Sequence, residues 1–452
     1  MCGTRRFRTE GMAGKMETQA ERKKIGYANE NFYYGFSGER TTVIRTELTL
    51  AEDVRPEMLR AALRQTLRRY PNFRQTLAVE GGRIFYAPQD GEALVGPEDG
   101  WQLYLGTAQT NGYLFRVVCD GPRLAVCAHH GLADGKGMFE FAKTLLYYYL
   151  KEQGIAADTE GMVLTNEAPG DATEQEDSFA KYADPRAKPL GLYQDGEAFR
   201  IPEPLFTQEQ PYCRRFRVCC SMQALLRLAR RYGATPVPVL SIVLSQALRR
   251  LYDVGEETVT GYIPVNLRPY YQSKALNNFS FAVTLPYRAR LRSLDWDVQA
   301  TIQRGILDLQ TQRENFDYKL ARMCASGEKT AQLPLPAAQK QAVLAARLRE
   351  NARARYSYLL SYVGAMALPA GLRATVRDME MFIPAFLVPF TVCAVALDDR
   401  LSLTCTQDFE GERVARALYE VLREQGIEAE YEDRGVVRAD KLVLGKLAQG
   451  GV

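Results

Sequence analysis

Two adjacent histidines are the first residues of this sequence that could do acid–base chemistry. His129 and His130 are the only histidines in the chain, and they follow the apolar run 124–128. Such a run is typical of a buried strand. Neighbouring side chains on a strand point to opposite faces, so one ring enters the core while the other faces the opposite surface. The two rings therefore cannot chelate one metal ion.

A glycine-rich turn follows the histidines. Gly131, Asp134, Gly135 and Gly137 come within a few residues, and the apolar segment 138–150 then predicts a helix. A strand, a sharp turn and a helix together display a side chain at the end of the strand. A histidine placed there is either a satisfied polar residue or a catalyst, and its spacing to the neighbouring residues has to decide between them.

Other chemistries find no support in the sequence. It contains no Gly-x-Ser-x-Gly nucleophile elbow and no phosphate-binding Gly-x-x-x-x-Gly-Lys-Ser/Thr loop. No cysteines or carboxylates are spaced around a histidine as metal ligands, so we expect no metal and no permanently bound cofactor. Nine cysteines without a Cys-x-x-Cys pair argue against a disulfide framework and fit a reduced, cytoplasmic setting.

Length and charge limit the possible classes of protein. The 452 residues suit about two to three domains of the usual size, and 46% hydrophobic with 25% charged residues is a globular composition. A net charge of +4 over so long a chain argues against nucleic-acid binding. The most apolar stretch, 385–397, is interrupted by Pro389 and is shorter than the ~20 residues that cross a bilayer, so we expect a buried strand and no membrane span.

Two passages of the chain share one layout, a strand followed by an amphipathic helix and further strands. The expected elements of the first are a strand at 40–50, a helix that begins at Pro56 and ends before Pro71, and a hairpin around Gly81-Gly82. The expected elements of the second are strands at 215–220 and 258–264 with helices at 222–231 and from Pro236.

The segment between these passages, 156–210, is rich in Gly, Pro, Asp and Glu and predicts a linker. Residues 1–24 are basic and have no apolar core, so they are not a secretory signal. We therefore predict a disordered tail at 1–24, an N-terminal half at 25–190 and a C-terminal half at 191–452.

The string His129-His130-Gly131-Leu132-Ala133-Asp134-Gly135 resembles the His-His-x-x-x-Asp-Gly signature of the chloramphenicol acetyltransferase-like superfamily. That superfamily includes condensation domains of nonribosomal peptide synthetases, alcohol acetyltransferases and plant acyltransferases of the BAHD type. The stretches that are also similar, within a resemblance extending over about 27–427, are Pro264-Val265-Asn266-Leu267-Arg268, Asn277-Asn278-Phe279, Ser361-Tyr362-Val363-Gly364 and Tyr70-Pro71-Asn72-Phe73-Arg74.

Two departures narrow the resemblance. Tyr362 stands where asparagine is more usual, and Asp408-Phe409-Glu410-Gly411 lacks the tryptophan of the second motif of the plant enzymes. A plant-type enzyme is therefore disfavoured.

The resemblance implies an α/β (α+β) fold in which two chloramphenicol acetyltransferase-like αβ-sandwich halves in one chain enclose a channel. It implies an acyl-CoA-dependent O- or N-acyltransferase that moves an acyl group from a thioester donor to a small alcohol or amine acceptor. His130 is then the general base, since an unperturbed pKa of ~6.5 leaves its ring mostly neutral at pH 7. His129 is then structural.

The resemblance also assigns supporting roles. Asp134 is expected to be architectural and to pair with Arg268 from the second half, and Gly135 to permit the tight turn into the helix. An oxyanion needs a hydrogen-bond donor, and both Ser361 and the backbone N–H of Gly135 are candidates.

Two alternative functions stay open: a condensation-type enzyme that depends on an acyl carrier protein, and a binding module that has kept the fold and lost turnover. No carrier domain follows the second half, so we expect a free-standing chain. We expect it to be a monomer because a chain that holds both halves can form the channel by itself. Two basic stretches, Arg60, Arg64 and Arg68 and then Arg347, Arg349, Arg353 and Arg355, are either solvated helix faces or contacts for coenzyme A phosphates or an acidic carrier.

Overall fold

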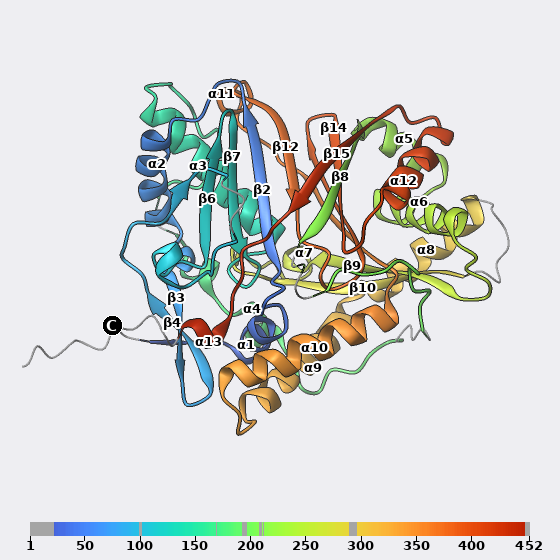
Figure 1. The fold of residues 1–452 in the computed structure, drawn as a ribbon, viewed down its shortest axis with the longest axis horizontal. Coiled ribbons are helices and arrows are strands. Elements are labelled where there is room, and N and C mark those ends of the chain that lie inside the picture. The colour runs from blue at the N-terminus through green and yellow to red at the C-terminus, as the bar shows by residue number, and fades with distance from the viewer. Residues whose placement is uncertain are drawn as a thin grey trace, which may run out of the picture.

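The computed structural model describes residues 22–98, 102–168, 170–191, 197–207, 210, 212–288 and 296–447. It has two lobes that lie side by side, each built on one large sheet, with a pair of long helices running beneath them (Figure 1). None of the helices in these ranges is long and apolar enough to cross a membrane.

The first lobe is built on a five-stranded sheet in the order β12-β2-β7-β6-β5. Its strands are β2 (Val43–Leu50), β5 (Val95–Gly96), β6 (Phe115–Asp120), β7 (Arg123–His129) and β12 (Val376–Phe382). The helices α2 (Pro56–Arg69) and α3 (Gly135–Glu152) pack together on one side of this sheet (Figure 1). Proline at the first turn and a buried leucine stripe explain why α2 forms where the spacing predicted it.

The second lobe is built on a seven-stranded sheet in the order β10-β9-β11-β13-β14-β8-β15. Its strands are β8 (Cys213–Ser221), β9 (Thr258–Asn266), β10 (Ser280–Arg288), β11 (Tyr358–Ala365), β13 (Phe390–Leu397), β14 (Arg400–Gln407) and β15 (Ala429–Val437). The helices on its outer side are α5 (Met222–Arg231), α6 (Pro236–Leu251), α8 (Trp296–Gln310) and α12 (Arg413–Glu424) (Figure 1).

The helices beneath the two lobes are α9 (Arg313–Ala331) and α10 (Ala337–Arg355), and α1 (Tyr27–Gly35) packs against both. The remaining helices are α4 (Ser178–Tyr182), α7 (Arg268–Tyr271), α11 (Ala370–Arg373) and α13 (Leu444–Leu447). A small third sheet consists of β1 (Lys23–Lys24), β3 (Gln75–Glu80) and β4 (Arg83–Pro88).

The hairpin β3–β4 forms where the sequence predicted it. Gly81 and Gly82 have φ values of 55° and 75°, the positive region that glycine reaches without steric cost. Lys23 and Lys24 pair with Tyr86 and Phe85 of β4, so these two residues of the segment expected to be a disordered tail belong to a sheet. Residues 1–21 of that expected tail lie outside the described residues.

One strand crosses between the lobes. β12 is late in the sequence, yet it pairs antiparallel with β2 in the sheet of the first lobe, with Met381 opposite Thr46. Its side chains Met379 and Met381 belong to the core of that lobe. The chain around 376–382 therefore packs with the first lobe although it follows most of the second, and the division of the chain at residue 190 stays a prediction.

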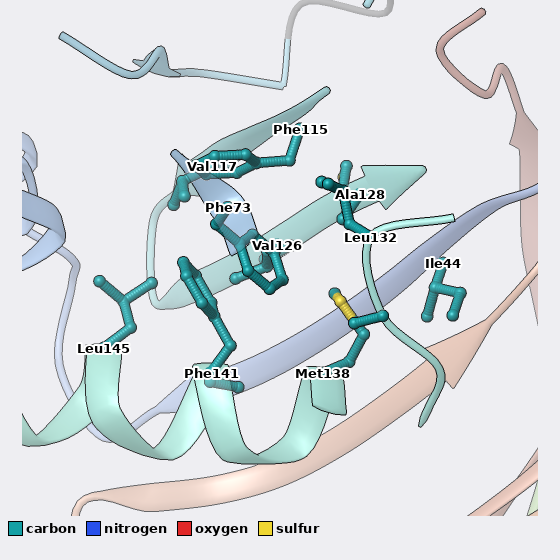
Figure 2. Packing of buried hydrophobic residues seen from close by; sticks show 14 of the residues in the cluster. Ile44, Phe73, Phe115, Val117, Val126, Ala128, Leu132, Met138, Phe141 and Leu145 are labelled. Atoms are coloured by element: carbon teal, nitrogen blue, oxygen red, sulfur yellow. The ribbon is translucent and has the colours of Figure 1, made fainter. Parts of the chain in front are cut away.

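An aromatic cluster fills the core beneath the histidine motif. Phe73, Phe115 and Phe141 are buried, and the rings of Phe73 and Phe141 stack with centroids 4.1 Å apart. Figure 2 shows these rings between β6, β7 and α3, with Leu132 and Met138 beside them. Because this packing holds the end of β7 and the start of α3, it fixes the turn between them.

Candidate active site

The site begins where β7 ends and α3 starts. His129 is the last residue of β7 and is completely buried. Its Nε2 lies 2.8 Å from Ser37 Oγ, and its Nδ1 accepts a hydrogen bond of 3.0 Å from the N–H of Gly131. Both ring nitrogens therefore have partners inside the protein, and the ring also stacks on Tyr33 with centroids 4.9 Å apart.

Burial sets the charge of His129. Burial and the neighbouring His130 lower the pKa of the His129 ring to about 3, although the backbone of Phe36 opposes the shift. The ring is neutral at pH 7, with Nδ1 as acceptor and Nε2 as donor to Ser37.

His130 has a different environment. It is only partly buried, its backbone N–H donates to the carbonyl of Thr42 (3.1 Å), and its ring lies 5.1 Å from that of Phe32. The Nδ1 atom is buried and has no hydrogen-bond partner among the described residues. Burial lowers the pKa of the ring below its usual value, and its own backbone and Asp134 partly offset the shift. His130 is therefore a neutral imidazole at pH 7.

Asp134 caps α3 and faces the second lobe. Its Oδ1 accepts from the N–H of Gly137 (3.1 Å), and its Oδ2 accepts from the N–H of Phe279 (2.9 Å) and from Arg268 Nη1 (2.7 Å). Burial alone would raise the pKa of this carboxyl, but Arg268 and the two N–H groups hold it below its usual range. Asp134 is ionised, and it caps its own helix through Oδ1 and binds the second lobe through Oδ2.

Arg268 makes further contacts in the second lobe. Its guanidinium donates to the carbonyls of Ala275 (2.5 Å) and Asn277 (2.6 Å) and to Asn266 Oδ1 (3.0 Å). The Arg268 side chain thus holds the loop 272–279 by hydrogen bonds to its carbonyls and connects it to α3 through Asp134.

A glycine is needed at position 135 for a different reason from the one that the sequence indicated. It is the first residue of α3, and its φ is not positive, so the turn itself does not require glycine. A Cβ here would lie 3.0 Å from Val363 of β11. The missing side chain makes room for the second lobe, and the expectation of a conformational role was wrong.

Two other glycines are more constrained, and sequence reasoning did not single them out. A Cβ on Gly137 would lie 2.3 Å from the carbonyl oxygen of Leu276, and one on Gly131 would lie 2.5 Å from the ring of Tyr33. Both are close approaches to residues distant in sequence, which no local pattern reveals.

His130 lies on a cavity of about 110 Å³ between the lobes. The residues that line it are Ile44, His130, Asp134, Gly135, Lys136, Pro264, Val265, Asn266, Ser280, Ser361, Tyr362, Val363, Met381, Ile383 and Cys393. Larger hollows of about 390 and 520 Å³ lie over α2 and along β8 and β14, but neither includes a histidine. We therefore place the candidate active site at the smaller cavity.

Both oxyanion candidates border this cavity. Ser361 lies on β11 beside Cys393 of β13, and the Gly135 N–H is at the start of α3. A bulge after Tyr362 leaves Val363 without a partner in the β11–β13 register, and such bulges re-aim side chains next to active sites. The Tyr362 hydroxyl lies 3.9 Å from Met222 Sδ.

The structure thus gathers His130, Asp134, Gly135 and Ser361 around one cavity and ties Arg268 to Asp134, with His129 behind them in the core. The cavity residues that sequence reasoning missed are Ile44, Lys136, Ser280, Met381, Ile383 and Cys393. Met381 and the following Ile383 arrive through the crossover of β12, for which the sequence carries no local signal.

The first basic stretch is largely neutralised. Arg60 pairs with Glu57, Arg64 with Glu92, and Arg68 with the Gln65 amide. These contacts fit a solvated helix face, and the alternative of a phosphate or carrier contact stays a prediction.

The late Asp408 is buried at an interlobe contact instead of the cavity. Its Oδ1 lies 2.5 Å from Arg40 Nη1 and its Oδ2 lies 2.7 Å from Arg353 Nη2. Arg40, missed by sequence reasoning, also donates to the carbonyls of Phe206 and Thr207.

The sequence matches no family model and no curated protein. Among solved structures, TRI101 of F. graminearum complexed with coenzyme A and deoxynivalenol is 12% identical, with 91% of this chain and 100% of that chain covered and a TM-score of 0.57. Polyketide synthase associated protein 5 from Mycobacterium tuberculosis is 13% identical, with 88% and 97% covered and a TM-score of 0.57.

The epimerization domain from the third module of tyrocidine synthetase B is 15% identical, with 90% and 96% covered and a TM-score of 0.55. The fold class is therefore confirmed: the chain has the two-lobed α/β fold of these solved structures.

Proposed function

We propose that this protein is an acyltransferase that moves an acyl group from acyl-CoA to an alcohol or amine, with His130 as general base. One observation supports the proposal: a neutral, partly exposed histidine lies on an interlobe cavity that is also lined by the two candidate oxyanion donors, Ser361 and Gly135. The likeness in fold to TRI101, whose structure was solved with coenzyme A and deoxynivalenol, agrees with it.

Each step needs only groups that border the cavity. With Nδ1 buried, Nε2 of His130 is the nitrogen that takes the proton from the acceptor O–H or N–H as that group attacks the thioester carbonyl. The Ser361 hydroxyl or the Gly135 N–H donates to the oxyanion. The tetrahedral intermediate then breaks its C–S bond, and the imidazolium returns the proton to the leaving thiolate.

Asp134 has no proton to transfer in this scheme. Its carboxylate already accepts from Arg268, Phe279 and Gly137, so it positions the turn that carries His130. No cofactor is bound permanently, and the thioester is a co-substrate.

A carrier-bound thioester is the second candidate donor. The likeness to the tyrocidine synthetase domain favours it, because the same base and oxyanion donors would act on an acyl group held by a carrier protein. A binding module without turnover is the remaining alternative. We propose that the protein acts as a monomer, because one chain supplies both walls of the cavity. We also propose a cytoplasmic setting, which its cysteine content fits.

A thiol-release assay tests the proposal. The full chain is incubated with acetyl-CoA, or with an acetylated carrier protein, and a panel of alcohols and amines. Release of free thiol that depends on an acceptor and is lost in His130→Ala supports the acyltransferase, and the donor that works identifies the thioester. Absence of acceptor-dependent release from both donors would leave only the binding module.

A further inference from the structure

One arginine on α10 is out of place for an amphipathic helix. Ala345 and Ala352 are buried, and Arg349 lies between them on the same inward face, since residues three and four apart are neighbours on a helix. Arg349 is only partly exposed and forms no ion pair or hydrogen bond with any described residue. A guanidinium on a buried face normally has a carboxylate partner.

Other cations surround Arg349. Arg353 lies one turn further along α10, and Arg40 approaches from the segment before β2. Asp408 is the acid among them, and each of its oxygens is already held by one of these two arginines, at 2.5 and 2.7 Å. Burial lowers the pKa of Arg349, and Arg353 and Arg40 lower it further. Three guanidinium groups therefore share one carboxylate.

This cluster adjoins the wall of the active site. Phe32 lies against the ring of His130 and stacks on Phe36 with centroids 4.0 Å apart. Phe36 and Leu348 pack against one small apolar cluster, which also contacts Ile383 from the cavity. A series of contacts through Phe32 and Phe36 therefore connects this part of α10 with His130.

We infer that Arg349, with Arg353 beside it, binds the phosphate group of the pantetheine arm of the thioester donor. The inference rests on the proposed function, since a thioester donor carries its phosphate at the far end of a long arm from the reacting carbonyl. Guanidinium groups bind phosphate through paired charge-assisted hydrogen bonds. The phosphate is shared by coenzyme A and by the prosthetic group of a carrier protein.

Calorimetric titration of the full chain tests this, with coenzyme A, 4′-phosphopantetheine and pantetheine as probes. Arg349→Ala is expected to weaken binding of coenzyme A about tenfold, the size of a lost charge-assisted hydrogen bond, and to leave binding of pantetheine unchanged. The matched control is Arg347→Ala, because Arg347 is on the exposed face of the same helix and its loss is expected to change nothing.

The three probes distinguish which phosphate Arg349 binds. A loss that extends to 4′-phosphopantetheine supports the inference, because that phosphate is common to both donors. A loss confined to coenzyme A would place Arg349 at the nucleotide phosphates and overturn the assignment to the pantetheine arm. Equal binding of coenzyme A by Arg349→Ala and wild type, an equal loss for pantetheine, or no binding of either phosphate probe by wild type overturns the inference. Phosphate-dependent binding without any thiol release would contradict the proposed function and still support the phosphate site at Arg349.

Discussion

At the scale of single residues, the two adjacent histidines differ in burial and in partners. Both are neutral at pH 7, but His129 uses both ring nitrogens inside the first lobe while His130 borders the interlobe cavity. His129 is the last residue of β7 and lies in the core, whereas His130 begins the turn that leads to α3.

His130→Ala is expected to lower kcat by ~10²–10⁴-fold, the usual contribution of a general base. The fold should survive, because the bond from the His130 N–H to Thr42 involves only the backbone. Steady-state thiol release measures the loss of kcat, and a circular dichroism melt checks that the fold is intact. Near-normal turnover by a folded variant would remove His130 from the mechanism.

His129 makes the folded state sensitive to acid. Its pKa is about 3 in the folded protein, against an ordinary 6.5, so the unfolded chain binds a proton that the folded chain refuses. Its contribution to stability is therefore complete above pH 6.5 and is lost as the pH falls toward 3. His129→Ala should be less stable at pH 7 and should lose less further stability between pH 7 and pH 5 than wild type in urea unfolding. A variant with the same pH dependence as wild type would contradict this assignment.

At the scale of elements, the contacts between α3 and the loop 272–279 control how the lobes meet. Asp134 and Arg268 are both nearly buried, and removing one partner of a buried ion pair costs about 3–5 kcal/mol. Asp134→Asn and Arg268→Ala should each lower the free energy of unfolding and the activity. The double variant should lose less than the two single losses added together. Additive losses in a full double-mutant cycle would show that the two side chains are not coupled.

A pair of helical glycines gives a matched test of the close approach. Gly137→Ala places a Cβ 2.3 Å from the Leu276 carbonyl, whereas a Cβ on Gly305 in α8 meets nothing within 4 Å. We expect Gly137→Ala to lower the melting temperature and the activity, and Gly305→Ala to stabilise by up to about 1 kcal/mol through helix propensity alone. Equal melting temperatures for the two variants would mean that α3 has room to shift.

The sequence predicted elements well where the signal was local. The bounds of α5 agree with the residues the pattern indicated, and Gly81-Gly82 forms the hairpin. The motif also placed His130 and Asp134 correctly at the end of a strand and the start of a helix. The reason for Gly135 was not predictable, because the atom that excludes a side chain there belongs to Val363 in the other lobe.

At the scale of the whole molecule, the crossover of β12 is what the sequence could not predict. Which strands pair depends on segments that are distant in sequence, so no local pattern predicts it. In this crossover, Glu380 of β12 lies directly opposite Glu47 of β2. Two like charges in register would be unfavourable, but Arg215 and Arg434 from the second lobe approach Glu380 at 3.6 and 3.2 Å. Glu47 pairs with Arg45 of its own strand, whereas the arginines that pair with Glu380 come from the second lobe.

The same assembly argues for a monomer with a complete site. His130 comes from the first lobe, Ser361 from the second, and β12 ties them within one chain. Specific activity should therefore stay constant on dilution into the nanomolar range, with a single-chain mass in light scattering. Mixing His130→Ala with Arg268→Ala should restore no activity, since no site is shared between chains. Recovered activity in the mixture, or a steep loss on dilution with a dimer mass, would show that a second copy completes the cavity.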